Sequence, residues 1–366
     1  MLVRKIRIMR FLAVLGASVL LLSACGSSSS NSASASPSTT TTAASASSSA
    51  SNASCTTIWG PASSLINGKL PSGLPCAKAH PYKVAVLGGL NCPYCSSWHK
   101  AVVGELKTLG ANVVLDLNAG GSASTQAAQM QEAIAKKPNG IIVFPVSPSA
   151  IVPSLLAAKS AGVDVEASNS PPVASALNDV IGYTGPANTQ EGQIAAKILA
   201  KAMHDKGNVI AILGAAGTTP EVNRLKGFKE ELAKIAPSMK ILGTGVGNWE
   251  EAQSLSATAS LLTRFGSKVG GIFAEDDTTA VGAAKAASAA GYSSLPIVGV
   301  GGSTAGLQAI KAGTVYGTMF QSPYMDGAFA PIMLYDQLEG LKHAHVVNLP
   351  LPIITKSNVS QFTPEW

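Results

Sequence analysis

The sequence predicts an α/β protein with two doubly wound, parallel-sheet lobes joined by a multi-strand hinge. From Tyr82 onward, short β-branched runs alternate with amphipathic stretches rich in Ala and Lys, the rhythm of βα units. The β-branched runs are apolar on both faces, as strands covered by helices on both sides require. The runs also fall into two series, separated by an extended link and a turn at residues 179–188. Two sheets are therefore expected.

The elements follow the chain in alternating order. The first series has predicted strands at 84–87, 113–117, 140–144 and 163–167, with helices at 96–109, 125–136 and 149–161. The second series has strands at 209–213, 241–244, 270–273, 297–300 and 315–320, with helices at 189–206, 221–235, 250–265, 278–290 and 304–312. In open α/β sheets, ligands lie beyond the carboxyl ends of the strands, so two facing lobes would enclose one cleft.

The chain is expected to pass between the lobes three times. The first crossing falls in the link at 179–188, the second near Gln321-Ser322-Pro323, and the third after Lys342. The predicted first lobe is 82–183 with 323–343, and the predicted second lobe is 184–321 with 344–366.

The first 24 residues are typical of a signal peptide. Four basic residues, the last of them Arg10, precede an apolar run at 11–22 that is too short to span a bilayer as a helix. Leu22-Ser23-Ala24-Cys25 then resembles a bacterial lipoprotein signal, which implies cleavage before Cys25 and a lipid on its thiol. The alternative is an ordinary secretory signal with an incidental cysteine. The lipoprotein interpretation predicts an extracytoplasmic protein that a lipid anchors to the cell membrane.

Composition limits the partners. Residues 26–54 are all Gly, Ser, Thr, Ala, Asn or Pro, so 25–54 is predicted to be a disordered tether. The formal net charge is +6, but four positive charges lie in the signal, which leaves about +2 for the rest. No basic cluster that would follow a phosphate backbone remains, and nucleic acid is not an expected partner.

Four cysteines remain once Cys25 is set aside. They are Cys55, Cys76, Cys92 and Cys95. An even number in an oxidising compartment favours two disulfides, for which three pairings exist. We favour Cys55–Cys76, which would staple the segment 55–81 to itself, and Cys92–Cys95.

Several local motifs lie within, or directly after, the predicted strands and helices. They are Lys83-Val84-Ala85-Val86, Asn91 to Tyr94, Gly140-Ile141-Ile142-Val143-Phe144-Pro145, Arg224-Leu225-Lys226-Gly227-Phe228, Phe273-Ala274-Glu275-Asp276-Asp277 and Gln321. In this order and spacing they resemble the type I periplasmic binding proteins, in particular the ribose/galactose-type sugar-binding group of ABC transporters. The resemblance covers roughly residues 82–355.

The resemblance implies ligand-binding residues on both lobes. They are Asn91, Tyr94, Phe144 and Asn169 on the first lobe, and Arg224, Trp249, Asp276 and Gln321 on the second. These side chains suit a polyol, which needs planar donors and acceptors at its edge and aromatic rings against its C–H faces. The alternative for each aromatic residue is packing within a lobe.

The sequence departs from the family pattern at three places. Asn169-Ser170 stands where the family usually has Asp-Arg, Gly301 replaces an Asp, and Asp276 replaces an Asn. The lost groups make bidentate hydrogen bonds to hydroxyls, so a roomier and differently charged pocket is expected. Either Arg224 and Asp276 pair across it, or Asp276 accepts a donor from the ligand. Asp277 is predicted to cap a helix.

Three other motifs suggest rival activities. Cys92-Pro93-Tyr94-Cys95 resembles the glutaredoxin active site and predicts, as an alternative, a thiol–disulfide redox lipoprotein. No Val-Pro signature follows, and the βα rhythm continues for two lobes, which favours a local disulfide. Residues 243–247 are rich in glycine but lack the third glycine and the acidic residue of a dinucleotide site. His343-x-His345 has no third ligand nearby, so no metal is expected.

The sequence therefore predicts a binding protein and not an enzyme. The expected role is that of a solute-binding lipoprotein of an ABC importer. It would capture a small polar solute by hinge closure, act as a monomer with a membrane permease as partner, and need no cofactor. A sensor that presents bound solute to a membrane receptor is an alternative that the sequence does not separate from an importer.

Overall fold

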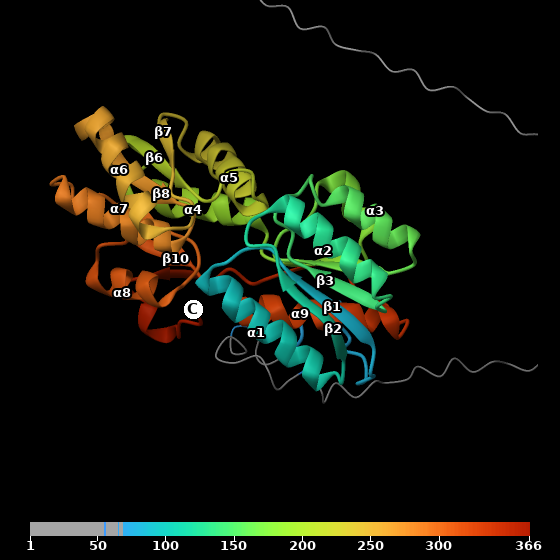
Figure 1. Cartoon of the computed structure of the whole chain (residues 1–366). Coiled ribbons are helices and arrows are strands. Elements are labelled where there is room, and N and C mark those ends of the chain that lie inside the picture. The colour runs from blue at the N-terminus through green and yellow to red at the C-terminus, as the bar shows by residue number, and fades with distance from the viewer. Residues whose placement is uncertain (1–54, 56–64, 66–68) are drawn as a thin grey trace, which may run out of the picture. The chain divides into compact units, whose positions relative to one another are not determined.

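The computed structural model describes Cys55, Leu65 and residues 69–366, and the last of these ranges folds into two α/β lobes (Figure 1). The predicted signal peptide, the tether and Cys25 lie outside the described residues.

The first lobe is built on a six-stranded parallel sheet with strand order β11-β5-β4-β3-β1-β2. Its strands are β1 (Lys83–Gly88), β2 (Asn112–Asn118), β3 (Gly140–Val143), β4 (Asp164–Ser168), β5 (Gly182–Gly185) and β11 (Val346–Asn348). Its helices are α1 (Pro93–Thr108), α2 (Ala123–Ala135), α3 (Val152–Ser160), α9 (Pro323–Leu338) and the short 3-10 helix η2 (Ala174–Asp179).

Alternate residues of the central strands enter two cores. Val84 and Val86 pack in the cluster that includes Trp98 of α1 and Phe329 of α9, whereas Ala85 and Leu87 pack in the cluster that includes Met130 of α2. This alternation places helices on both faces of the sheet. Figure 1 shows α9, from late in the chain, lying beside α1.

The second lobe repeats the plan with strand order β12-β10-β9-β8-β6-β7, in which β12 alone pairs antiparallel among the pairs described. Its strands are β6 (Asn208–Leu213), β7 (Ile241–Val246), β8 (Val269–Ala274), β9 (Ile297–Val298), β10 (Gly317–Met319) and β12 (Ile353–Thr355). Its helices are α4 (Asn188–Ala202), α5 (Thr219–Ile235), α6 (Glu251–Phe265), α7 (Asp277–Ala289), α8 (Thr304–Ala312) and the short η3 (Gly266–Lys268) and η4 (Val359–Gln361).

Helices α4 and α5 approach each other unusually closely through two glycines. A Cβ at Gly192 would lie 2.0 Å from the carbonyl oxygen of Arg224, and a Cβ at Gly227 would lie 2.0 Å from that of Thr189. Any larger residue would separate the helices. This contact fixes the position of Arg224, which α5 carries.

The predicted strands and helices overlap elements of the structure, but the helix α9 and the strands β5, β11 and β12 were not predicted as such, nor were the short 3-10 helices. The assignments of residues 184–185 and 344–348 to the second lobe are wrong, because β5 runs to Gly185 within the first sheet. Strand β11 pairs with β5 in the sheet of the first lobe, so the third crossing lies at 349–352, between β11 and β12. The other two crossings lie at 186–187 and 320–322.

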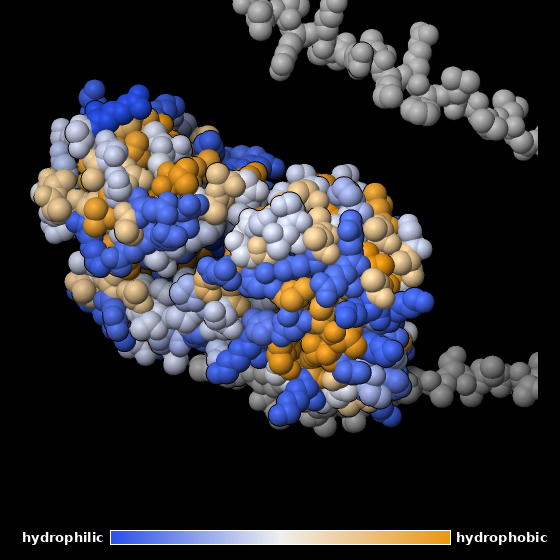
Figure 2. All heavy atoms as spheres, in the orientation of Figure 1, coloured by the Kyte–Doolittle hydropathy of each residue, from blue (hydrophilic) through white to orange (hydrophobic). Residues whose placement is uncertain are grey.

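Strand β2 forms one edge of the first sheet and leaves apolar side chains partly exposed, Val113 among them. Figure 2 shows apolar residues gathered on this lobe. No helix among the described residues has both the length and the apolar character needed to cross a membrane.

Candidate functional site

A cavity lies between the two lobes, beyond the carboxyl ends of their strands. It encloses about 550 Å³ of empty space, a volume that includes the solvent at its mouth. Seven of the eight predicted ligand-binding residues line it: Tyr94, Phe144, Asn169, Arg224, Trp249, Asp276 and Gln321. The structure thus brings together residues that lie far apart in the sequence.

Asn91 is the predicted residue that does not line this cavity. It borders a neighbouring surface groove together with His99 and Asp116, whose side chains pair at 2.8 Å. Cys92 and Cys95 border both spaces, so their disulfide separates the groove from the cavity.

Arg224 is the buried cation of the cavity, and the protein already occupies three of its five N–H donors. Nε donates to Glu191 Oε2 at 2.7 Å, and Nη1 donates to the carbonyl oxygen of Glu275 at 2.8 Å. Nη2 donates to Gln321 Oε1 at 2.8 Å. Burial opposes the charge, but the Glu191 carboxylate raises the pKa of Arg224 above its ordinary value. Arg224 therefore stays cationic and rigidly held.

Of the two alternatives for Asp276, the pairing with Arg224 is wrong, because the carboxylate partner of Arg224 is Glu191. Glu191 stands in the first turn of α4 and reaches Arg224 across the close α4–α5 contact.

Asp276 instead caps helix α7, accepting a hydrogen bond from the backbone N–H of Thr279 at 2.7 Å. Burial raises the pKa of Asp276. The predicted helix cap, Asp277, is the first residue of α7 and is fully buried. It accepts hydrogen bonds from Ser303 N and Thr318 Oγ1, both at 2.7 Å. The capping prediction was therefore one residue out, and Asp277 fastens α7 to neighbouring strands and loops.

Trp249 reaches the cavity through an unusual backbone conformation. It and Asn248 have φ values of +63° and +61°, a region that non-glycine residues occupy rarely and often at functional sites. The ring lies against Gly214, where a Cβ would come within 1.9 Å of Cη2. The guanidinium carbon of Arg224 lies 5.8 Å from the ring centroid, within reach of a cation–π interaction.

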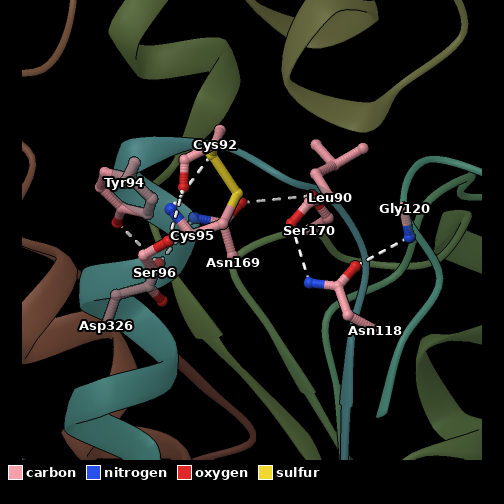
Figure 3. Close-up of a disulfide and its surroundings, with 10 residues drawn as sticks. All are labelled: Leu90, Cys92, Tyr94, Cys95, Ser96, Asn118, Gly120, Asn169, Ser170 and Asp326. Carbon is pink, nitrogen blue, oxygen red and sulfur yellow. Dashed lines mark hydrogen bonds between the residues drawn. A yellow bond between two sulfur atoms is a disulfide. The ribbon is translucent and has the colours of Figure 1, made fainter.

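A buried acid supports the first-lobe side of the cavity. Asp326, in the first turn of α9, accepts hydrogen bonds from Tyr94 Oη at 2.7 Å and from Asn169 Nδ2 at 2.6 Å. Figure 3 shows both side chains directed at this carboxyl group. Burial raises the pKa of Asp326 to about 7. The Asp326 carboxyl thus fixes the orientation of two cavity-lining residues.

The structure joins Cys92 to Cys95 and Cys55 to Cys76, the two pairings favoured above. Cys92 also caps α1, since its Sγ accepts from the backbone N–H of Cys95 at 3.0 Å. Pro93 follows at the start of that helix, where proline is favoured.

Phe144 packs in the first-lobe core as well as lining the cavity. Its ring contacts Trp98 edge-on, with centroids 5.3 Å apart. The alternative given above for each aromatic residue, packing within a lobe, therefore also applies to Phe144. Sequence reasoning missed Glu191, Asp326 and Trp366, which support or line the cavity.

The two lobes have the same architecture, and the chain passes between them three times. They enclose a cavity lined by aromatic rings and by polar groups that the protein holds in place. These features define a two-lobed solute-binding protein. Among the described residues, no group of three or more His, Cys, Asp and Glu side chains is placed to hold a metal ion.

The chain belongs to the periplasmic binding protein family. The family described as "Periplasmic binding protein domain" matches residues 85–342. A xylitol-binding protein of Mycolicibacterium smegmatis is 32% identical over 66% of this chain and 68% of its own length. The ribose import binding protein of Escherichia coli is 26% identical over 66% of this chain and 80% of its own. These relatives are named for binding and import, which supports the prediction that the protein is not an enzyme.

Solved structures agree on the fold. A periplasmic solute-binding protein of an ABC transporter from Actinobacillus succinogenes, with bound D-allose, matches with a TM-score of 0.69 and 25% identity. The match covers 77% of this chain and all of that chain. A solute-binding protein from Bacillus halodurans with bound myo-inositol has the same fold, with a TM-score of 0.70, 20% identity and coverage of 77% of this chain and 97% of that one.

Proposed function

We propose that the protein is an extracytoplasmic solute-binding lipoprotein of an ABC importer that captures a neutral sugar or polyol in the interlobe cavity. The bonding of Arg224 carries this proposal. Its charge is matched by Glu191, and three of its N–H donors are taken by the protein. The remaining guanidinium N–H donors suit hydroxyl oxygens better than an anion, which would meet a cation already neutralised.

The other lining residues favour the same class of solute. Tyr94, Trp249 and Phe144 offer aromatic surface, and Asn169, Asp276 and Gln321 offer planar polar groups. Such a lining matches the alternating C–H faces and hydroxyl edges of a polyol. The names of the relatives, which bind xylitol or import ribose, agree with this choice.

The three crossings at 186–187, 320–322 and 349–352 are short. We expect them to act as a hinge about which the lobes open and close, so that solute shifts the population toward the closed form. The closed form would then deliver the unaltered solute to a membrane permease. Cys25, outside the described residues, would carry the lipid that holds the protein to the membrane.

A thermal-shift screen tests the proposed solute class. A ligand that binds the folded protein raises the melting temperature by mass action. Sugars and polyols such as xylitol, D-ribose and D-allose should raise it, whereas amines, nucleosides and carboxylates at the same concentration should not. A shift confined to charged compounds would contradict the proposal.

The redox alternative is separated by replacing Cys92 and Cys95 with serine. A solute-binding protein should keep its fold and its binding, with an adjusted affinity, because the disulfide only shapes the cavity wall. A thiol–disulfide enzyme should lose all activity toward a dithiol substrate.

A further inference from the structure

Trp366 lines the interlobe cavity, although it lies outside the residues 85–342 that match the family. Its ring stands edge-on to Tyr94, with centroids 5.7 Å apart and an interplanar angle of 85°. Figure 1 marks the end of the chain close to α8 and the start of α1. The last residues therefore contribute a wall to a cavity that is otherwise built from the two lobes and the crossing at 320–322.

The ring fills a space that Gly301 leaves empty. A Cβ at this glycine would lie 2.5 Å from Cζ2 of Trp366, and the φ of Gly301 is +140°, which favours glycine. A side chain at position 301 and the indole at 366 cannot both occupy this place. The absence of a side chain at Gly301 thus makes room for the ring of Trp366.

The segment that carries Trp366 is fastened to both lobes. Thr304, which begins α8, donates from N and Oγ1 to the Trp366 carbonyl oxygen at 2.8 and 2.9 Å. Ser97 of α1 donates from Oγ to the Glu365 carbonyl oxygen at 2.9 Å. Ser322, in the second crossing, donates from Oγ to Glu365 Oε2 at 2.6 Å. These bonds hold the indole in a fixed position at the cavity.

We propose that Trp366 is a specificity-determining residue that contacts the solute, and that residues 363–366 form a strap that positions it. The indole presents a rigid aromatic surface at a corner where Gly301 presents none. Such a surface packs against the C–H face of a neutral sugar or polyol. This inference rests on the proposed function and extends it by adding a wall from outside the matched family region.

Calorimetric titration with xylitol, D-ribose and D-allose tests the contact. Trp366→Ala should weaken binding of the tightest of these at least tenfold, whereas Trp366→Phe, which keeps an aromatic face, should weaken it less. Tyr316→Ala is the matched control, since Tyr316 is an exposed aromatic residue that does not line the cavity, and it should bind as the unaltered protein does.

The outcomes separate this inference from the proposed function. If the unaltered protein binds a probe and Trp366→Ala binds it equally well, the inference is overturned and the proposed function stands. If the unaltered protein binds none of the three probes, the proposed function falls and takes this inference with it.

A double-mutant cycle tests the placement independently of any ligand. Gly301→Ala should lower the melting temperature more in the unaltered protein than in Trp366→Ala, because the clash with the ring exists only in the former. The strain of a positive φ is present in both backgrounds and cancels. Equal losses in the two backgrounds would overturn the placement of the ring.

Discussion

At the scale of single residues, position after a strand was the informative signal. Tyr94, Phe144, Trp249 and Asp276 follow strands closely in sequence, and parallel strands bring their carboxyl ends to one edge, so their convergence could be predicted. Glu191 could not be predicted in this way, since an acid in the first turn of a helix ordinarily needs no further explanation than the helix dipole. Only the packing of α4 on α5 brings it to Arg224.

Removal of either main side chain of the second lobe should weaken binding. Trp249→Ala removes an aromatic face and Arg224→Ala removes the held cation, and each should reduce affinity at least tenfold, or about 1.4 kcal/mol. Calorimetry with the best solute from the screen measures this. Lys226→Ala, an exposed basic residue on the same helix, should leave affinity unchanged.

Arg224→Ala also leaves Glu191 buried without its cation, which costs stability. The melting temperature should therefore be recorded for each variant. If Arg224→Ala does not fold, Trp249→Ala alone tests whether the solute binds in this cavity. Full affinity in folded Trp249→Ala would mean that the solute binds elsewhere.

At the scale of elements, amphipathic periodicity found the surface helices and missed α9. Almost every residue of α9 is buried, so its sequence has no polar face to reveal a helical period. Strands β11 and β12 are three residues long, too short for alternation to distinguish them from loop. Because β11 was not predicted as a strand, residues 344–348 were assigned to the wrong lobe.

The α4–α5 contact gives a prediction at this scale. Gly227→Ala should push the two helices apart and move Arg224 away from Glu191, because the added Cβ would meet the carbonyl oxygen of Thr189. We expect a loss of about 1–3 kcal/mol in the free energy of unfolding together with weaker solute binding. Denaturant unfolding and calorimetry measure the two effects.

Ser256→Ala, on the exposed face of α6, serves as the control and should change neither quantity. Unaltered stability in Gly227→Ala would show that the helices are not in close contact.

At the scale of the whole molecule, the repeated βα rhythm was sufficient to predict two lobes, since each series supplies most of the strands of one sheet. The βα rhythm could not reveal that several aspartate and glutamate side chains are buried within the lobes and between them. Burial raises the pKa of Asp277 to about 6, of Asp326 and Asp336 to about 7, and of Glu105 to about 8. Carboxyl groups in the unfolded chain titrate near 4.

These raised pKa values predict that stability falls as pH rises. Between about pH 4 and each raised pKa, the folded protein binds more protons than the unfolded chain, so the free energy of unfolding decreases across that range. The melting temperature should be higher at pH 5 than at pH 8. Glu105→Gln should make the decline shallower between about pH 4 and pH 8, the range over which only the folded protein keeps this carboxyl group protonated. A melting temperature that rises from pH 5 to pH 8 would contradict the raised pKa values.

The central claim is that a solute binds, unaltered, between two lobes that close on it. Diffraction from crystals grown with the tightest solute of the thermal screen tests this most directly. The account predicts density for the intact solute in the cavity, in contact with Tyr94, Trp249 and Arg224. Density on the outer surface of one lobe, or a solute that has been chemically changed, would contradict it.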